Sequence, residues 1–283
     1  MTGARAWGAA VWRVLGHAAV WAAFYSGACT LMVAQLALGE RDPGEGPVLF
    51  AALTGLGVYL LDRAKLSDRA LDPADEQAQP ARFAFVRRWA GVLRVSAVAC
   101  LVGASVLGWL IEWPLVGAPW VGAVVVLFYG GGLAWPRGRL KRWVVVMNLV
   151  VAVGLTGFAA VAAGMTGFLD RGVVPLGEGL AVVVLVVFGD AVLCDIADAE
   201  ADLDAGTRPI PAVFGGRAAW GVAVAVEVAA VGVGAVVGRA AWGWTVPIAV
   251  TTPALMVLPT RVVRDLVDMR LAVVALLAWA AWG

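Results

Sequence analysis

Long apolar stretches, separated by short polar connections, run along the whole chain. A helix needs about 20 consecutive apolar residues to cross the hydrocarbon core of a bilayer, and the chain divides at this scale. Nothing in it alternates apolar and polar residues in the way that a membrane β-barrel strand does. The pattern therefore predicts an all-α polytopic membrane protein with about nine transmembrane helices in a single bundle. The predicted segments are 11–38, 46–65, 89–111, 117–135, 143–167, 174–198, 216–238, 241–260 and 270–283.

Composition favours the same interpretation. Apolar residues make up 62% of the chain and charged residues 14%, with a mean hydropathy of +0.88, whereas about a quarter of a soluble domain is charged. A net charge of +1 gives no reason to expect a nucleic-acid partner. Glycines such as Gly154 and Gly157 are interpreted as sites of close helix contact. We expect a single transmembrane domain over residues 1–283, embedded in membrane lipid.

Lys and Arg residues predict the orientation in the membrane. They are concentrated in four connections, which all lie on the cytoplasmic side if the N-terminus does. The chain is thus predicted to lie in the cell inner membrane, with the N-terminus cytoplasmic and the C-terminus on the opposite side. The four connections are 63–88, 137–142, 208–217 and 261–270, and the basic residues on the other side are Arg41, Arg171 and Arg239.

An acidic stretch, DIADAEADLDAG at 195–206, follows the sixth predicted segment. Placing one Asp at the centre of a membrane helix costs about 3 kcal/mol of insertion free energy. Several Asp residues must therefore lie at a solvent-exposed helix end or line a polar cavity. At about 100° per residue, Asp195, Asp198 and Asp202 fall within about 60° of one another on a helix, and Asp204 points elsewhere. Three carboxylates are therefore predicted on one helix face. Asp204, Asp265 and Asp268 are interpreted as solvated loop charge.

A second acidic group, LLDRAKLSDRALDPADEQAQPARF, occupies residues 60–83 on the same predicted side. Asp68 and Asp72 are four residues apart and share a face, although Asp72 before Pro73 also has the features of a helix N-cap. Carboxylates brought together repel, and hard cations with oxygen ligands relieve the repulsion. Mg²⁺ typically takes one or two carboxylates plus substrate phosphates. The candidate metal ligands are Asp62, Asp68, Asp72, Asp195, Asp198 and Asp202.

A basic stretch, WPRGRLKRW at 135–143, lies between the two acidic groups on the same predicted side. Arg137 is interpreted as a topology anchor at the membrane interface. The other cations suit a diphosphate, because several charge-assisted hydrogen bonds can hold an anion that Mg²⁺ bridges to the carboxylates. The candidate diphosphate-binding residues are Lys65, Arg69, Arg139, Lys141, Arg142, Asn148 and Arg208.

With these motifs the chain resembles the UbiA prenyltransferase superfamily over nearly its whole length. The stretch at 195–206 fits the family pattern D-x-x-D-x-x-x-D followed by glycine, and RLKRW with Asn148 matches a pattern after the fourth helix. The first motif departs from the family, because Ala64 stands where N-x-x-x-D-x-x-x-D has its Asn. Leu203 also replaces a basic residue that often follows the last Asp.

The resemblance implies a Mg²⁺-dependent intramembrane prenyltransferase. An isoprenyl diphosphate would be ionised at the two Asp-rich motifs, and an aromatic or lipid acceptor that the sequence does not identify would take the prenyl group. Tyr59 is the candidate aromatic face for the allylic cation. The implied catalytic residues are Tyr59, Asp68, Asp72, Asp195, Asp198 and Asp202.

Two alternatives remain open at this stage. A UbiA-type membrane terpene cyclase would ionise the same diphosphate and let the cation cyclise without an acceptor, and the missing Asn of the first motif favours this reading. A cation or lipid transporter would not be an enzyme at all. Transporters of that kind are often built from internal repeats with broken helices, and the sequence contains no clear repeat.

Overall fold

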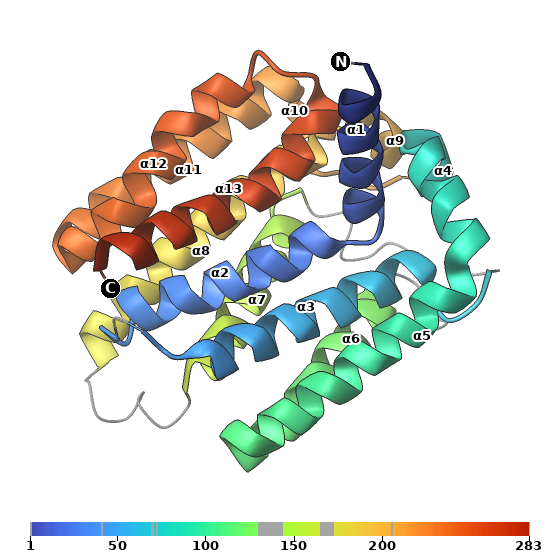
Figure 1. The fold of residues 1–283 in the computed structure, drawn as a ribbon. Coiled ribbons are helices and arrows are strands. Elements are labelled where there is room, and N and C mark those ends of the chain that lie inside the picture. The colour runs from blue at the N-terminus through green and yellow to red at the C-terminus, as the bar shows by residue number, and fades with distance from the viewer. Residues whose placement is uncertain are drawn as a thin grey trace.

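The computed structural model describes residues 2–40, 42–68, 71, 73–129, 144–164, 173–204 and 206–282. Within these ranges every regular element is a helix (Figure 1). The long helices pack side by side, and four short or amphipathic ones, α1, α4, α9 and α10, gather at one end of the bundle. The C-terminus lies at the other end.

The chain forms two runs of helices on either side of the undescribed range 130–143. The first run contains α1 (Thr2–His17), α2 (Val20–Leu36), α3 (Glu45–Ala64), α4 (Pro73–Ala78), α5 (Pro80–Ile111), the 3-10 helix η2 (Trp113–Gly117) and α6 (Ala118–Tyr129). The second run contains α7 (Val146–Gly164), α8 (Val173–Asp195), α9 (Ala199–Asp204), α10 (Ile210–Phe214), α11 (Gly216–Val237), α12 (Arg239–Leu255) and α13 (Thr260–Trp282).

Proline and glycine set several helix boundaries. Helices α4 and α5 begin at Pro73 and Pro80, where a missing N–H costs nothing because the first helical N–H has no partner within the helix. Gly215 (φ 83°) and Gly238 (φ 121°) separate α10 from α11 and α11 from α12 in conformations that favour glycine. Pro80 and Gly215 thus separate the short helices α4 and α10 from the long helices that follow them, and Gly238 separates two long helices.

Each of the nine predicted segments overlaps a helix, but the number of spans is not confirmed. Five described helices are long and apolar enough to cross a membrane, and the pair formed by α1 and α2 makes a sixth if it is one span. The predicted segment 11–38 is not one continuous helix, because this pair is bent by 66° at its break. Ala19 has a left-handed backbone there, with φ 58°, and interrupts the helix. The architecture remains an all-α membrane bundle.

Helix α2 lies at the centre of the bundle. Every residue from Trp21 to Leu36 is buried except Phe24. Glycines let two neighbours approach it closely: a Cβ at Gly55 of α3 would lie 2.2 Å from Ser26 Oγ, and one at Gly179 of α8 would lie 2.4 Å from the Leu36 carbonyl oxygen. Small residues at such contacts are typical of packing between membrane helices.

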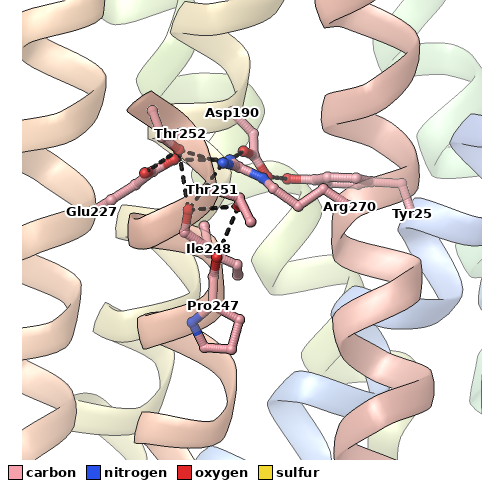
Figure 2. Close-up of polar contacts among 8 residues, drawn as sticks. All are labelled: Tyr25, Asp190, Glu227, Pro247, Ile248, Thr251, Thr252 and Arg270. Atoms are coloured by element: carbon pink, nitrogen blue, oxygen red, sulfur yellow. Dashed lines mark hydrogen bonds and ion pairs between the residues drawn. The ribbon is translucent and has the colours of Figure 1, made fainter. Parts of the chain in front are cut away.

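A buried polar network joins five helices in the half of the bundle around α8 (Figure 2). Arg270 of α13 pairs with Asp190 of α8 and, at 2.8 Å, with Glu227 of α11. The Thr252 hydroxyl on α12 donates to Glu227 Oε2 at 2.5 Å, and the Tyr25 hydroxyl on α2 donates to Asp190 Oδ2 at 2.8 Å. All five side chains are buried. Sequence reasoning assigned no role to Glu227 or Arg270.

Candidate functional site

The two acidic connections meet at the end of the bundle where the short helices gather (Figure 1). Gln77 of α4 donates from Nε2 to Asp204 Oδ2 of α9 at 2.8 Å. Gln79, next to α5, donates from Nε2 to Asp198 Oδ1 at 2.8 Å. The connection after α3 is therefore held directly against the connection after α8.

The second acidic stretch does not form one continuous helix. Helix α8 ends at Asp195, residues 196–198 form a turn, and α9 begins at Ala199. The prediction that Asp195, Asp198 and Asp202 share one helix face is therefore wrong in its geometry. The break has a tertiary cause, because Asp198 lies in the turn and bonds to side chains from other elements.

Asp195, Asp198 and Asp202 each have their own partner. Asn148 of α7 donates from Nδ2 to Asp195 Oδ2 at 2.8 Å. Arg264 of α13 donates from Nη1 to Asp198 Oδ2 at 2.6 Å, on the side opposite to Gln79. Asp202 Oδ1 accepts from the Thr207 hydroxyl at 2.8 Å. The carboxylates are thus oriented by residues from three other parts of the chain.

The first acidic stretch begins in the last turn of α3. Helix α3 ends at Ala64, so Asp62 lies within it and Asp68 lies beyond it. Asp62 Oδ1 pairs with the buried Lys65 Nζ at 2.6 Å, and Asp68 Oδ1 pairs with Arg94 Nη2 at 2.5 Å. The Asp68 side chain is 68% exposed. Lys65, a predicted diphosphate ligand, is engaged by a carboxylate of its own connection.

Of the remaining predicted metal-binding and diphosphate-binding residues, two are described by the structure and five lie outside the described residues. Asn148 is buried, and its Oδ1 atom has no hydrogen-bond partner among the described residues. Arg208 is exposed in the connection between α9 and α10. Five predicted site residues lie outside the described residues, namely Arg69, Asp72, Arg139, Lys141 and Arg142.

The described residues do not form a protein-only metal centre. Among them, no group of three or more His, Cys, Asp or Glu side chains is arranged to hold a metal ion. Asp62, Asp68 and Asp198 each face a Lys or Arg instead. Mg²⁺ in phosphate-handling sites needs only one or two carboxylates, because substrate phosphates and water complete its shell. One or two of the carboxylates of Asp195, Asp198 and Asp202 would be enough for an ion of that kind.

A basic pocket of about 330 Å³ lies beside Asp198. The Arg63 guanidinium donates to the carbonyl oxygens of Gly16 and His17, the latter at 2.8 Å, and Arg264 lies between the pocket and Asp198. The charged residues that line the pocket are Arg13, Arg63, Arg82, Arg264, Asp265 and Asp268. Four guanidinium groups against two carboxylates suit an anion with several oxygens, such as a phosphate.

Sequence reasoning missed this pocket because it placed residues 261–270 in a connection. Helix α13 begins at Thr260, ten residues before the predicted segment, so Asp265 and Asp268 are not loop charges. Asp265 Oδ2 accepts from Trp12 Nε1 at 3.1 Å, and Asp268 lines the pocket. The four-residue spacing of Arg264 and Asp268 places them on one helix face and was the available signal.

An apolar cavity of about 520 Å³ lies next to the carboxylate end, bounded by α2, α3, α6 and α7. Tyr59 and many valines and glycines line it. Val121, Val125 and Val150 line the cavity and are also exposed, so it opens on the side of the bundle that faces lipid. Val150 lies two residues after Asn148 on α7, and Tyr59 lies three residues before Asp62 on α3, so one end of the cavity is level with the start of the polar end.

These features define a class of site: a side-open apolar cavity, together with an end of the same bundle that is lined by carboxylates and guanidinium groups. Such a site suits an amphiphile with an apolar tail and an anionic head. Neither a protein-family model nor the sequence of a curated protein matches the chain. Two solved structures share its fold.

One is the apo structure of a UbiA homologue from Aeropyrum pernix K1. It is 18% identical, with a TM-score of 0.59, and the alignment covers 93% of this chain and 97% of that one. The other is a digeranylgeranylglyceryl phosphate synthase, 14% identical with a TM-score of 0.50, and 95% of each chain is covered. The chain therefore has a UbiA-type fold, and the predicted resemblance to that superfamily is confirmed at the level of the fold.

Proposed function

We propose that this chain is a Mg²⁺-dependent intramembrane prenyltransferase that ionises an isoprenyl diphosphate and transfers the prenyl group to an acceptor. The observation that carries the proposal is the apolar cavity, lined by Tyr59 and Val150, which reaches the level of Asp62 and of the Asn148–Asp195 pair. The fold shared with a UbiA homologue supports it, as does the fold shared with a prenyl-lipid synthase. The acceptor is an aromatic compound or a lipid.

The diphosphate head is assigned to the polar end of the bundle. Mg²⁺ bound there would neutralise charge on the leaving diphosphate. The chain's own residues have separate tasks: Asn148 orients the Asp195 carboxylate, Gln79 and Arg264 orient Asp198, and the guanidinium groups of the basic pocket bind phosphate oxygens. The further proposed ligands are Asp62, Lys65, Asp68, Arg69, Asp72, Arg139, Lys141, Arg142, Asp202 and Arg208.

The tail and the reacting carbon are assigned to the apolar cavity. Its lining excludes water from an allylic cation that water would otherwise quench. Tyr59 lies on the cavity wall, on the same helix as Asp62 and one turn before it. An aromatic ring at that position stabilises positive charge between the tail and the leaving diphosphate.

Product analysis tests this function. Purified protein is incubated with Mg²⁺ and labelled geranylgeranyl diphosphate, with and without a panel of aromatic acids and phosphoglycerol lipids. A transferase consumes the donor and makes a prenylated acceptor, which is the expected result. A hydrocarbon or alcohol made without an acceptor would identify a cyclase, the alternative that Ala64 favours by replacing the family's Asn. No consumption under any condition would contradict both and favour a transporter or lipid binder.

A further inference from the structure

The wall of the apolar cavity on α7 contains two exposed positions that have no side chain. Gly154 and Gly157 of α7 line the cavity, and a Cβ added at either one meets no described atom within 4 Å. The expectation that these glycines allow close helix contact is therefore wrong. By contrast, Gly55 and Gly179 lie directly against α2. Gly154 and Gly157 leave space instead of permitting contact.

An aromatic pair lies at the wall of the cavity, in the half away from Val150. Phe158 of α7 lines the cavity and stacks on the buried Phe50 of α3, with ring centroids 5.8 Å apart and planes 24° apart. From Val150 to Val161 the lining of α7 extends over eleven steps of the helix, or about 16 Å at the rise of an α-helix. Gly154 lies four residues after Val150 and seven before Val161.

The size of the cavity fits a particular length of chain. Its volume is about 520 Å³, and a group of the size of water or methylene occupies about 30 Å³, so the cavity holds about 17 such groups. This corresponds to about three to four isoprene units. The lining is almost wholly apolar, and the open side faces lipid, from which a tail can enter.

We propose that this cavity is the tail site of the donor and selects farnesyl and geranylgeranyl diphosphates, with Gly154 and Phe158 as the residues that set the length. The inference rests on the proposed function and adds the donor class to it. Gly154 gives the middle of the tail its space, and Phe158 limits how far the tail reaches. A side chain at position 154 occupies the tail's volume without displacing a described neighbour.

Binding of non-hydrolysable thiolodiphosphate analogues tests the proposal, because it requires no turnover. The analogues carry geranyl, farnesyl, geranylgeranyl and solanesyl tails, and affinity is measured on purified protein in detergent. In the natural protein we expect affinity to rise about tenfold from geranyl to farnesyl and to change little beyond geranylgeranyl. Gly154→Leu should keep the affinity for geranyl and lose about tenfold for the two longer tails.

Three further variants accompany this test. Gly243→Leu is the matched control, since a Cβ at Gly243 of α12 also meets no described atom within 4 Å and Gly243 does not line the cavity. It should behave as the natural protein does. Phe158→Ala should raise the affinity for the solanesyl analogue relative to farnesyl. Gly154→Ala, a smaller change, should shift affinity in the same direction as Gly154→Leu and serves if the leucine variant does not fold.

The outcomes separate the tail site from the proposed function. An unchanged length preference in both Gly154 variants, in protein that binds the analogues, would overturn the tail site and leave the transferase untouched. A second outcome is that binding depends on tail length and changes in Gly154→Leu, while the protein consumes no prenyl diphosphate. That result would contradict the proposed function and leave the tail site standing. Equal losses for every tail in Gly154→Leu and Gly243→Leu would also overturn the proposal.

Discussion

Asp198 is the residue at which the separate parts of the polar end meet. Its two carboxylate oxygens accept hydrogen bonds from Gln79 and Arg264, which come from different elements, and its side chain is 20% exposed. A carboxylate held from both sides is oriented before any substrate arrives. Such preorganisation is what an electrostatic role in ionising a diphosphate requires.

Replacing Asp198 by Asn should therefore abolish most of the turnover. Asp198→Asn keeps the shape and removes the charge, and we expect kcat to fall by about a hundredfold or more, as when a preorganised charge is lost from a catalytic site. Asp204→Asn is the control, because Asp204 is exposed and bonds only to Gln77 among the contacts described for it. Steady-state kinetics with saturating Mg²⁺ checks this, and near-normal activity in Asp198→Asn would rule out the assigned role.

Arg264 tests the basic pocket separately from the carboxylates. Arg264→Ala should weaken binding of a prenyl thiolodiphosphate by about 1.5–3 kcal/mol, the range for hydrogen bonds to charged groups. Binding of the uncharged prenyl alcohol should hardly change, because the alcohol has no phosphate for the guanidinium to hold. Arg264→Lys keeps the charge and should recover part of the loss. Equal losses for the diphosphate analogue and the alcohol would mean that Arg264 supports the fold only.

At the scale of helices, the network around Arg270 ties α13 to α8, α11 and α12. Removing the guanidinium leaves Asp190 and Glu227 buried together with no cation between them. Breaking a buried ion pair on one side costs about 3–5 kcal/mol. Arg270→Leu should therefore lower the midpoint of thermal unfolding in detergent markedly. Arg239→Leu, at an exposed arginine at the start of α12, should leave it unchanged. Equal midpoints for the two variants would show that the network contributes little.

The sequence was most informative about the positions of the helices. Each predicted segment overlaps a helix because burial in lipid demands long apolar runs. The predicted helix boundaries are wrong where a helix contains charged residues. Helix α13 begins ten residues before the predicted segment, because Arg264, Asp268 and Arg270 face into the bundle and not into water. The break between α8 and α9 depends on Gln79 and Arg264, which are distant in sequence. Periodicity within one segment carries no information about such partners.

At the scale of the whole molecule, both acidic connections lie at one end of the bundle, and the connection between α2 and α3 lies at the other (Figure 1). Cysteines at Glu76 and Arg208 should be labelled by an impermeant reagent from the same side of the membrane, predicted to be cytoplasmic. A cysteine at Asp42 should be labelled only from the opposite side. The native cysteines are replaced first. Labelling of Asp42→Cys and Glu76→Cys from one side would contradict the arrangement.

The central claim is that the polar end ionises an isoprenyl diphosphate held by its tail in the membrane. The most direct measurement is release of labelled diphosphate from geranylgeranyl diphosphate by the purified protein. We predict release that depends on Mg²⁺, stops when the metal is chelated, and is lost in Asp198→Asn while Asp204→Asn retains it. Absence of release by a natural protein that binds the donor analogue, or equal release by Asp198→Asn, would contradict the account.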